Sequence, residues 1–179
     1  MITITLGTIP FQFNRAINWI HVLIERGIIT EPIFIQHGVS NVLFLKKYPF
    51  VTTAPILESK NMRAISQASR MIISHAGQGS TRSLVSQNSR FVLLPRLAKY
   101  GEHIDDHQLF FARSIEPLGV RYCLTLEELK YAILNPPNPV NSGFLQEPKL
   151  ANHLLKIYPP GQEVEVKSLS SQDQNSIKF

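Results

Sequence analysis

Short apolar runs rich in β-branched residues alternate along this chain with longer segments of helical periodicity, and this alternation limits the folds available to it. The runs cover residues 2–6, 32–36, 71–74, 91–94 and 120–123, with weaker ones at 42–45 and 50–53. The helical segments cover residues 14–26, 59–68, 79–87, 104–117 and 125–134. Thr125 and Glu128 have the spacing of a capping box, which predicts where the last of these helices begins. Strands that are nearly all apolar and that alternate with helices predict an α/β, Rossmann-like parallel sheet with helices on both faces.

The length and composition of the chain fit one folded domain followed by a tail. Of its 179 residues 44% are hydrophobic and 17% charged, which is enough to bury a core. We expect a single domain over residues 1–160, with regular structure broken at 135–143 and a final helix at 150–157. Residues 161–179 are polar and predict a disordered tail.

The charge balance and the single cysteine narrow the choice of partners and compartment. Eighteen basic and thirteen acidic residues give a net charge of +5, which favours anionic partners such as nucleotides, acidic membrane surfaces or nucleic acid. The basic residues are scattered, so nucleic acid is the least favoured of these.

Cys123 ends an apolar run, and we expect it to be an inert core thiol in a reducing cytoplasm. No stretch approaches the roughly 20 apolar residues of a membrane span, and the first residues lack the basic region of a signal peptide. These features predict a soluble protein, or one attached to a membrane only at its surface.

Three polar loops follow predicted strands and are expected at one edge of the sheet. They are Gly7-Thr8, the segment 74–80 with the sequence SHAGQGS, and the segment 95–108. In open α/β sheets, ligands bind outside the carboxyl ends of the strands. Gly77 and Gly79 allow a ligand to approach the backbone closely, and Ser80 can donate a hydrogen bond from the first helical turn. The spacing matches neither a P-loop nor a dinucleotide-binding motif.

The segment 95–108, PRLAKYGEHIDDHQ, is unusually rich in ionisable groups, and three kinds of site are considered for it. His103 and His107 share a helix face, and with Asp106 they suggest a divalent-cation site, but a third ligand, such as His75, would have to come from elsewhere. We therefore predict no metal. Asp105 and Asp106 point in different directions on a helix, so they do not form an acid/base pair, and one of them is expected to cap it. His107 and Gln108, in the first helical turn, are placed to hydrogen-bond the hydroxyl groups of a ligand.

Four segments together resemble glycosyltransferase family 28. They are ITLGT (4–8), FIQHG (34–38), ISHAGQGS (73–80) and PRLAKYGEHIDDHQ (95–108). The likeness spans roughly residues 1 to 135, and it is strongest to the small, split members that contain only the C-terminal, donor-binding half of a GT-B enzyme. Those members include the small subunit of the dolichol-linked GlcNAc transferase and bacterial proteins of exopolysaccharide synthesis.

The resemblance implies a UDP-sugar as donor substrate, no cofactor, and transfer of a hexosyl group to a lipid-linked sugar acceptor. It implies a membrane-anchored partner that resembles the missing N-terminal half and recruits a cytoplasmic chain to the inner face of the membrane. The resemblance also implies positions for the donor-binding residues. Gly7 and Thr8 would contact the pyrophosphate, and Met62 would approach the uracil. The diphosphate and ribose would be lined by His75, Gly77, Gly79 and Ser80, and the loop that holds the sugar would contain Glu102, His103, Asp106, His107 and Gln108. Arg96 or Lys99 could add positive charge. No residue is assigned to catalysis, because the general base is expected in the partner.

The chain departs from the family pattern at two places. Ser83 stands where relatives carry an acidic residue that binds the ribose, and residues 88–90 replace a Gly-Lys-Pro segment. The first departure suggests an alternative function, a nucleotide-sugar-binding subunit without turnover of its own. A metal-dependent hydrolase centred on His103 and His107 is the third hypothesis, and nucleic-acid binding is the last.

Overall fold

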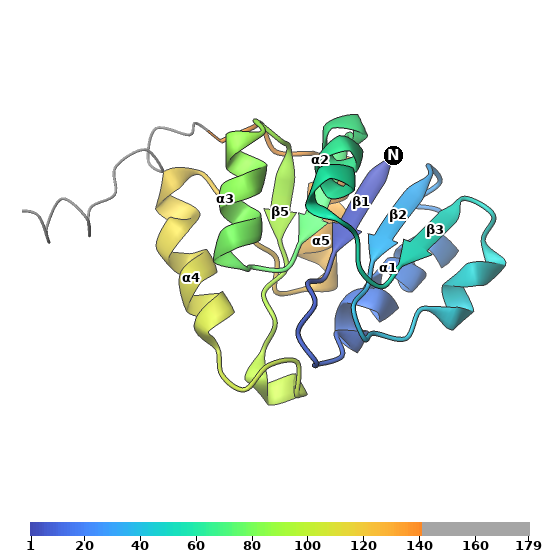
Figure 1. The fold of residues 1–179 in the computed structure, drawn as a ribbon, viewed down its shortest axis with the longest axis horizontal. Coiled ribbons are helices and arrows are strands. Elements are labelled where there is room, and N and C mark those ends of the chain that lie inside the picture. The colour runs from blue at the N-terminus through green and yellow to red at the C-terminus, as the bar shows by residue number, and fades with distance from the viewer. Residues whose placement is uncertain (141–179) are drawn as a thin grey trace, which may run out of the picture. The chain divides into compact units, whose positions relative to one another are not determined.

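The computed structural model describes residues 1–140, which contain five strands and five α-helices (Figure 1). The strands are β1 (Ile2–Thr5), β2 (Ile33–Gln36), β3 (Val51–Ala54), β4 (Met71–Ser74) and β5 (Phe91–Leu93). The α-helices are α1 (Asn14–Glu25), α2 (Ser59–Ala68), α3 (Gln78–Ser86), α4 (His107–Ile115) and α5 (Leu126–Leu134). The predicted helix at 150–157, the tail at 161–179 and the stretch 141–160 of the predicted domain lie outside the described residues.

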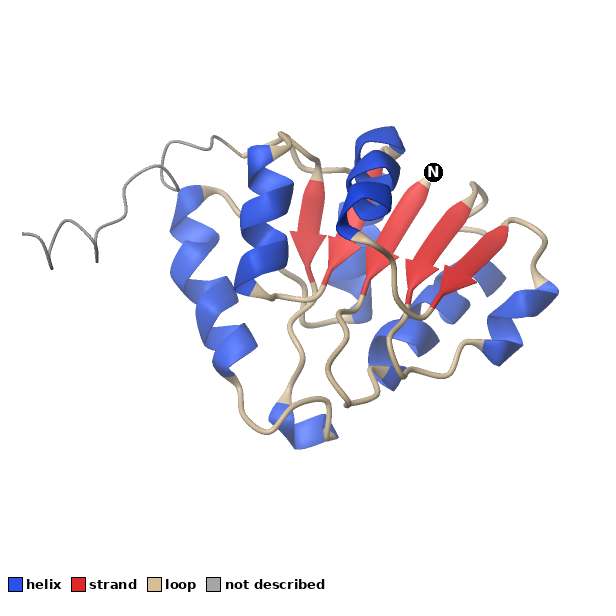
Figure 2. Cartoon of the chain, viewed as in Figure 1, coloured by secondary structure: helices blue, strands red, loops and turns tan. Residues whose placement is uncertain are grey.

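The five strands form one parallel sheet in the order β3-β2-β1-β4-β5, which confirms the predicted Rossmann-like α/β fold (Figure 2). Every residue of β1, β2 and β4 is buried. Strands that are covered on both faces need apolar side chains in both directions, which explains their continuous apolar runs. The register aligns Thr5 with Gln36 and Ser74, so these three residues mark the carboxyl edge of the sheet centre.

Helices cover both faces of the sheet, with α1 and α5 behind it and α2 and α3 in front of it in Figure 1. The larger core joins the buried sides of α1 and α5 to the sheet residues Ile2, Ile4 and Ile35. The smaller core joins α3 and α4 to Ile72 and Leu93 on the other face. The alternation of strand side chains between the two faces places Ile72 and Ile73 in different cores. No helix among residues 1–140 is long and apolar enough to cross a membrane.

Three of the predicted elements differ from the structure. The weak strand at 42–45 is a 3-10 helix, Leu43–Lys47, because the side chain of Asn41 accepts a hydrogen bond from the Leu43 amide and turns the chain. The run at 120–123 forms only an isolated bridge between Leu93 and Tyr122. Helix α4 begins at His107 instead of 104. The predicted capping box is confirmed, since Thr125 and Glu128 exchange both of its hydrogen bonds at the start of α5.

Candidate functional site

The carboxyl ends of β1 and β4 form the centre of the candidate site. The chain runs outward from β1 to β2 and β3, and then returns to place β4 on the other side of β1. Such a reversal leaves a crevice at the carboxyl ends of the two central strands, where ligands of open α/β sheets bind. Gly7 and Thr8 follow β1, and His75 to Gly77 follow β4, so two of the three predicted loops meet at this crevice.

The His75 ring lies between the backbones of Gly7 and Gly77. A Cβ atom on Gly77 would lie 2.5 Å from His75 Nε2, and one on Gly7 would lie 2.9 Å from the same atom. Gly7 also has a φ of +76°, a conformation that side chains disfavour. A side chain at either glycine would therefore clash with the His75 ring unless that ring or the backbone shifted.

His75 is neutral at physiological pH. Its Nδ1 lies 3.2 Å from the carbonyl oxygen of Thr5. Burial lowers the pKa of His75 to about 4, against the smaller raising effect of that hydrogen bond. Because a carbonyl only accepts, the Nδ1 carries the proton and Nε2 remains an acceptor on the side of the two glycines. A neutral histidine in this orientation can accept a hydrogen bond from a ligand hydroxyl group.

Gln36 holds the loop after β1, and the sequence reasoning did not single it out. Its side-chain oxygen accepts hydrogen bonds from the Gly7 amide (3.1 Å) and from the Thr5 hydroxyl (3.0 Å), while its amide group donates to the Gly7 and Pro55 carbonyls. The Gly7 N–H is thus occupied, and of the pair predicted at the pyrophosphate only Thr8 is exposed. A glutamine that ends an apolar strand was the available signal, because a buried amide needs partners.

Helix α3 begins just after the short loop that follows the carboxyl end of β4. The N-cap residue is Gly77, which has no side chain that could accept a hydrogen bond from the first amides of the helix. The amides of the first helical turn, which includes Gly79 and Ser80, have no acceptor within the helix. Together with the helix dipole, these groups make the start of α3 suited to a phosphate group.

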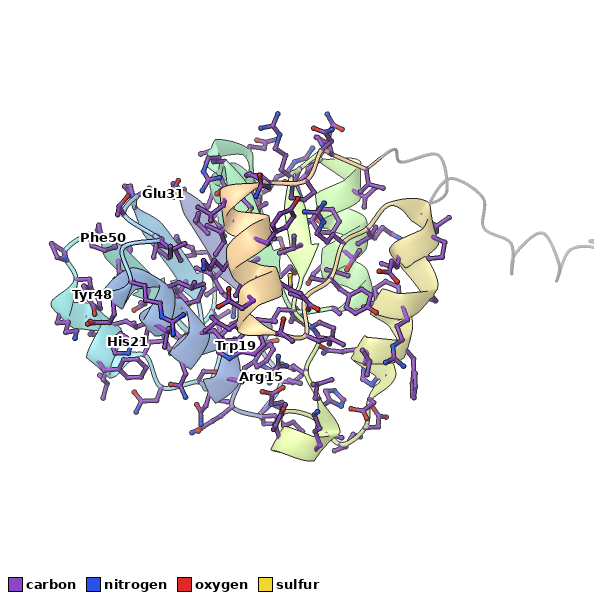
Figure 3. The ribbon with its side chains drawn as sticks, turned by 180° about the vertical axis from the view of Figure 1, so that it is seen from behind. Arg15, Trp19, His21, Glu31, Tyr48 and Phe50 are labelled. Carbon is purple, nitrogen blue, oxygen red and sulfur yellow. The ribbon has the colours of Figure 1, made fainter. Side chains whose placement is uncertain are left out.

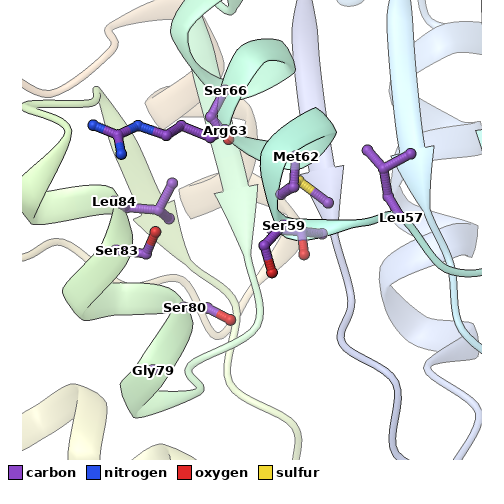
Figure 4. A pocket seen from close by; sticks show the side chains of 10 residues that line it. Leu57, Ser59, Met62, Arg63, Ser66, Gly79, Ser80, Ser83 and Leu84 are labelled. Carbon is purple, nitrogen blue, oxygen red and sulfur yellow. The ribbon is translucent and has the colours of Figure 1, made fainter.

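A pocket of about 260 Å³ opens between α2 and α3 beside this helix start (Figure 4). It is lined by Thr5, Leu57, Ser59, Met62, Arg63, Ser66, Gly79, Ser80, Ser83 and Leu84. The predicted residues Met62, Gly79 and Ser80 are therefore brought together. Ser83 lies on the same wall, where its hydroxyl accepts a hydrogen bond from Gln87. Ser59 and Arg63 were not foreseen, because nothing in the sequence separates them from the solvent-facing residues of α2.

Arg96 is a core residue, which corrects the suggestion that its side chain could add positive charge at a ligand. Its side chain is 1% exposed and its guanidinium group lies 4.6 Å from the centre of the Phe13 ring. It donates hydrogen bonds to the carbonyl oxygens of Leu6, Phe11 and Glu102. Burial lowers the pKa of Arg96 to about 10, so it stays charged at neutral pH. Arg96 therefore joins the loop after β1 to the segment 95–108.

Glu102 and Gln108, both predicted to contact the sugar, are also buried. Glu102 accepts two hydrogen bonds from Arg15 and one from the Leu97 amide. The Gln108 side-chain oxygen accepts from the Arg96 amide, and its amide nitrogen has no partner among residues 1–140. The structure thus gives Glu102 a role in shaping the loop. Only one end of Gln108 is left for a ligand.

His103, Asp105 and His107 form a compact group in which three potential metal-ligating atoms lie within 4.8 Å of one another. The two imidazole rings are close, 4.3 Å between centroids, although His103 precedes the helix. The carboxylate of this group is Asp105, which bonds the amide and the ring of His107, and these bonds lower the pKa of Asp105. Asp106 instead accepts a hydrogen bond from Ala98, and His75 lies outside the group.

Cys123 is buried, and burial raises the pKa of its thiol to about 12, as expected for a core cysteine. It therefore takes no part in the site.

A model of the "Glycosyltransferase family 28 C-terminal domain" matches residues 1–153. The chain belongs to glycosyltransferase family 28. No curated protein matches it.

Solved structures support the fold of this family 28 domain. The glycotransferase of kitacinnamycin superimposes with a TM-score of 0.51 and 15% identity over 87% of this chain and 37% of its own. MurG of Acinetobacter baumannii gives a TM-score of 0.51 and 17% identity over 74% of this chain and 40% of its own. The chain thus spans about two fifths of the length of each of these glycosyltransferases.

Proposed function

We propose that this family 28 domain binds a UDP-sugar and serves as the donor-binding, catalytic subunit of a split hexosyltransferase. The observation that carries the proposal is the pocket between α2 and α3, which joins the uncapped start of α3 at the switch point of the sheet. The pocket offers Met62 and Leu57 to a base and serine hydroxyls to a ribose, and the α3 amides offer their N–H groups to a diphosphate.

In this proposal the chain stabilises the leaving nucleoside diphosphate. An acceptor hydroxyl attacks C1 of the donor sugar, the bond to the diphosphate oxygen breaks, and negative charge develops on the diphosphate. The positive end of α3 stabilises that charge in this proposal. His75 Nε2 accepts from a hydroxyl of the donor, and the free amide of Gln108 donates to another. The proton of the acceptor is taken by a base on the partner.

The partner, the acceptor and the location are proposed from the likeness of segments 73–80 and 95–108 to the split members of the family. The partner is a membrane-anchored chain that supplies the other half of the GT-B fold. The acceptor is a lipid-linked saccharide at the inner face of the membrane, of the kind used in exopolysaccharide or glycolipid synthesis.

Calorimetry with UDP- and GDP-sugars tests the donor assignment. We expect UDP-sugars to bind and Gln108→Ala to lower the affinity for the sugar conjugate by about tenfold while leaving that for UDP unchanged. An unchanged affinity for the UDP-sugar would sink the sugar assignment. Reconstituting the chain with its partner then tests transfer. Robust transfer by the isolated chain would refute the split enzyme. Any activity of the chain that survives a strong chelator such as EDTA would rule out the metal-dependent hydrolase.

Ser83 favours the second candidate function, a binding subunit without turnover, because the pocket wall lacks the carboxylate of relatives. Ser83→Glu should raise the affinity for UDP by roughly tenfold if a carboxylate at this wall binds the ribose hydroxyls. Ser86→Glu, at an exposed position of the same helix outside the pocket, is the matched control. Donor binding without transfer in the reconstituted pair would favour the binding subunit over the enzyme.

A further inference from the structure

A second pocket, of about 590 Å³, lies between the first turns of α1 and the 3-10 helix Ala98–Tyr100. It is lined by Gln12, Asn14, Arg15, Asn18, Trp19, Tyr100, Gly101 and Glu102, and it shares no residue with the pocket between α2 and α3. Its size suits a small ligand. Nothing in the proposed donor site uses it.

Two aromatic side chains and an arginine build one side of this pocket. Figure 3 shows Arg15 and Trp19 on the same part of α1. The Arg15 guanidinium carbon lies 4.8 Å from the centre of the Trp19 ring and 5.4 Å from that of Tyr100. Trp19 is partly buried, whereas Tyr100 is 56% exposed. The arginine thus holds together two ring systems, one of which is open to a ligand.

Arg15 has one donor nitrogen without a partner. Its side chain is 10% exposed, its Nε and Nη2 atoms bond Glu102, and Nη2 also bonds the Pro95 carbonyl. Its buried Nη1 meets no acceptor among residues 1–140. Aromatic rings surround this guanidinium and shield Nη1 from solvent, so Arg15 orders Trp19 and Tyr100 and is not counted as a ligand contact.

The charge of the pocket points to a neutral ligand. Arg15 and Glu102 are its only charged lining residues, and their charges cancel. Three of the uncharged lining residues, Gln12, Asn14 and Asn18, carry amide side chains, which both donate and accept hydrogen bonds. Aromatic faces carry negative potential and attract the C–H groups on the face of a sugar ring, while amides bond its hydroxyls.

We propose that this pocket binds a neutral saccharide and forms a subsite for the sugar acceptor. The loop 95–108 supplies Tyr100, Gly101 and Glu102 to the pocket and then leads into the start of α4, so one loop links it to the predicted donor-sugar residues. Assigning the saccharide to the acceptor rests on the proposed function. Saccharide binding itself does not.

Trp19 provides a direct assay, because it is the only tryptophan of the chain. The full chain is titrated with methyl glycosides of glucose, galactose and N-acetylglucosamine and with short oligosaccharides, and tryptophan fluorescence is recorded. We expect a saturable change for at least one neutral saccharide, in the millimolar range for a single sugar unit. Tyr100→Ala and Asn18→Ala should each weaken it by about tenfold. Tyr131→Ala, which removes a similarly exposed tyrosine from α5, should leave it unchanged.

The outcomes of this titration distinguish a failure of the saccharide subsite from a failure of the proposed donor site. If no neutral saccharide changes the Trp19 fluorescence of protein that binds UDP-sugar by calorimetry, the subsite is overturned and the proposed function is left intact. Saccharide binding without any UDP-sugar binding supports the pocket and removes the proposed function, and with it the acceptor assignment. A response to glucuronate or phosphate alone, or equal loss in Tyr131→Ala, overturns the proposal.

Discussion

Replacing Arg96 with methionine should destabilise the protein without unfolding it. Methionine matches most of the length of the arginine side chain, so the change removes the guanidinium group and leaves little empty volume. The structure assigns that group three hydrogen bonds to main-chain carbonyls, those of Leu6, Phe11 and Glu102. Because these oxygens belong to two segments that lie far apart in the sequence, the change tests the contribution of a long-range connection to stability.

The expected loss in the free energy of unfolding is about 3 kcal/mol. Each buried carbonyl left without a partner costs about 1–3 kcal/mol. Part of that cost is offset, because a guanidinium group whose pKa is lowered to about 10 by burial is itself costly to desolvate. A loss of this size is smaller than the roughly 5–15 kcal/mol total stability of a typical domain, so the variant should still fold.

Urea unfolding measured by far-ultraviolet circular dichroism and by Trp19 fluorescence gives the free energies. The midpoint should fall by about 1–2 M relative to the wild type. Arg113→Met is the matched control, because Arg113 is exposed on α4, and it should change the stability by less than about 0.5 kcal/mol. A loss of under about 1 kcal/mol in Arg96→Met would show that water reaches the three carbonyls and would refute the reasoning.

Two further predictions concern the crevice. Since the unfolded chain protonates His75 near pH 6.5 and the folded protein only near pH 4, the stability contributed by the neutral ring is full above pH 6.5 and is lost as the pH falls to 4. Urea titrations across this window should show a decrease of roughly 3 kcal/mol that is absent in His75→Gln, and an equal slope in both proteins would contradict the buried neutral ring. Gly77→Ala should cost about 1–3 kcal/mol and weaken UDP-sugar binding, because its Cβ would lie 2.5 Å from the His75 ring. Gly79→Ala, whose Cβ meets no atom of the described chain within 4 Å, should be neutral or slightly stabilising, and similar losses in both variants would argue against the clash.

Local patterns were enough to predict the architecture. The apolar run of β1, the helical spacing of α1 and the capping box of α5 each depend on residues within a few positions of one another. The strand order along the chain also allowed the positions of the polar loops to be predicted, because the carboxyl ends of parallel strands share one edge of the sheet. The segment 42–45 was mispredicted because its apolar residues resemble a strand, while Asn41 turns the chain.

The sequence by itself determined the parallel α/β fold and the edge of the sheet at which polar loops gather, because periodicity and turn chemistry are local. Tertiary structure alone decided which polar side chains face inward. Arg96 bonds a carbonyl 90 residues away, and Arg15 bonds Glu102 across 87 residues. No spacing in the sequence reveals such partners, so the sequence could not show that Arg96 and Glu102 are buried and connect distant segments. The pairing of Arg15 with Glu102 also helps to form the pocket beside Trp19, which no sequence motif predicts.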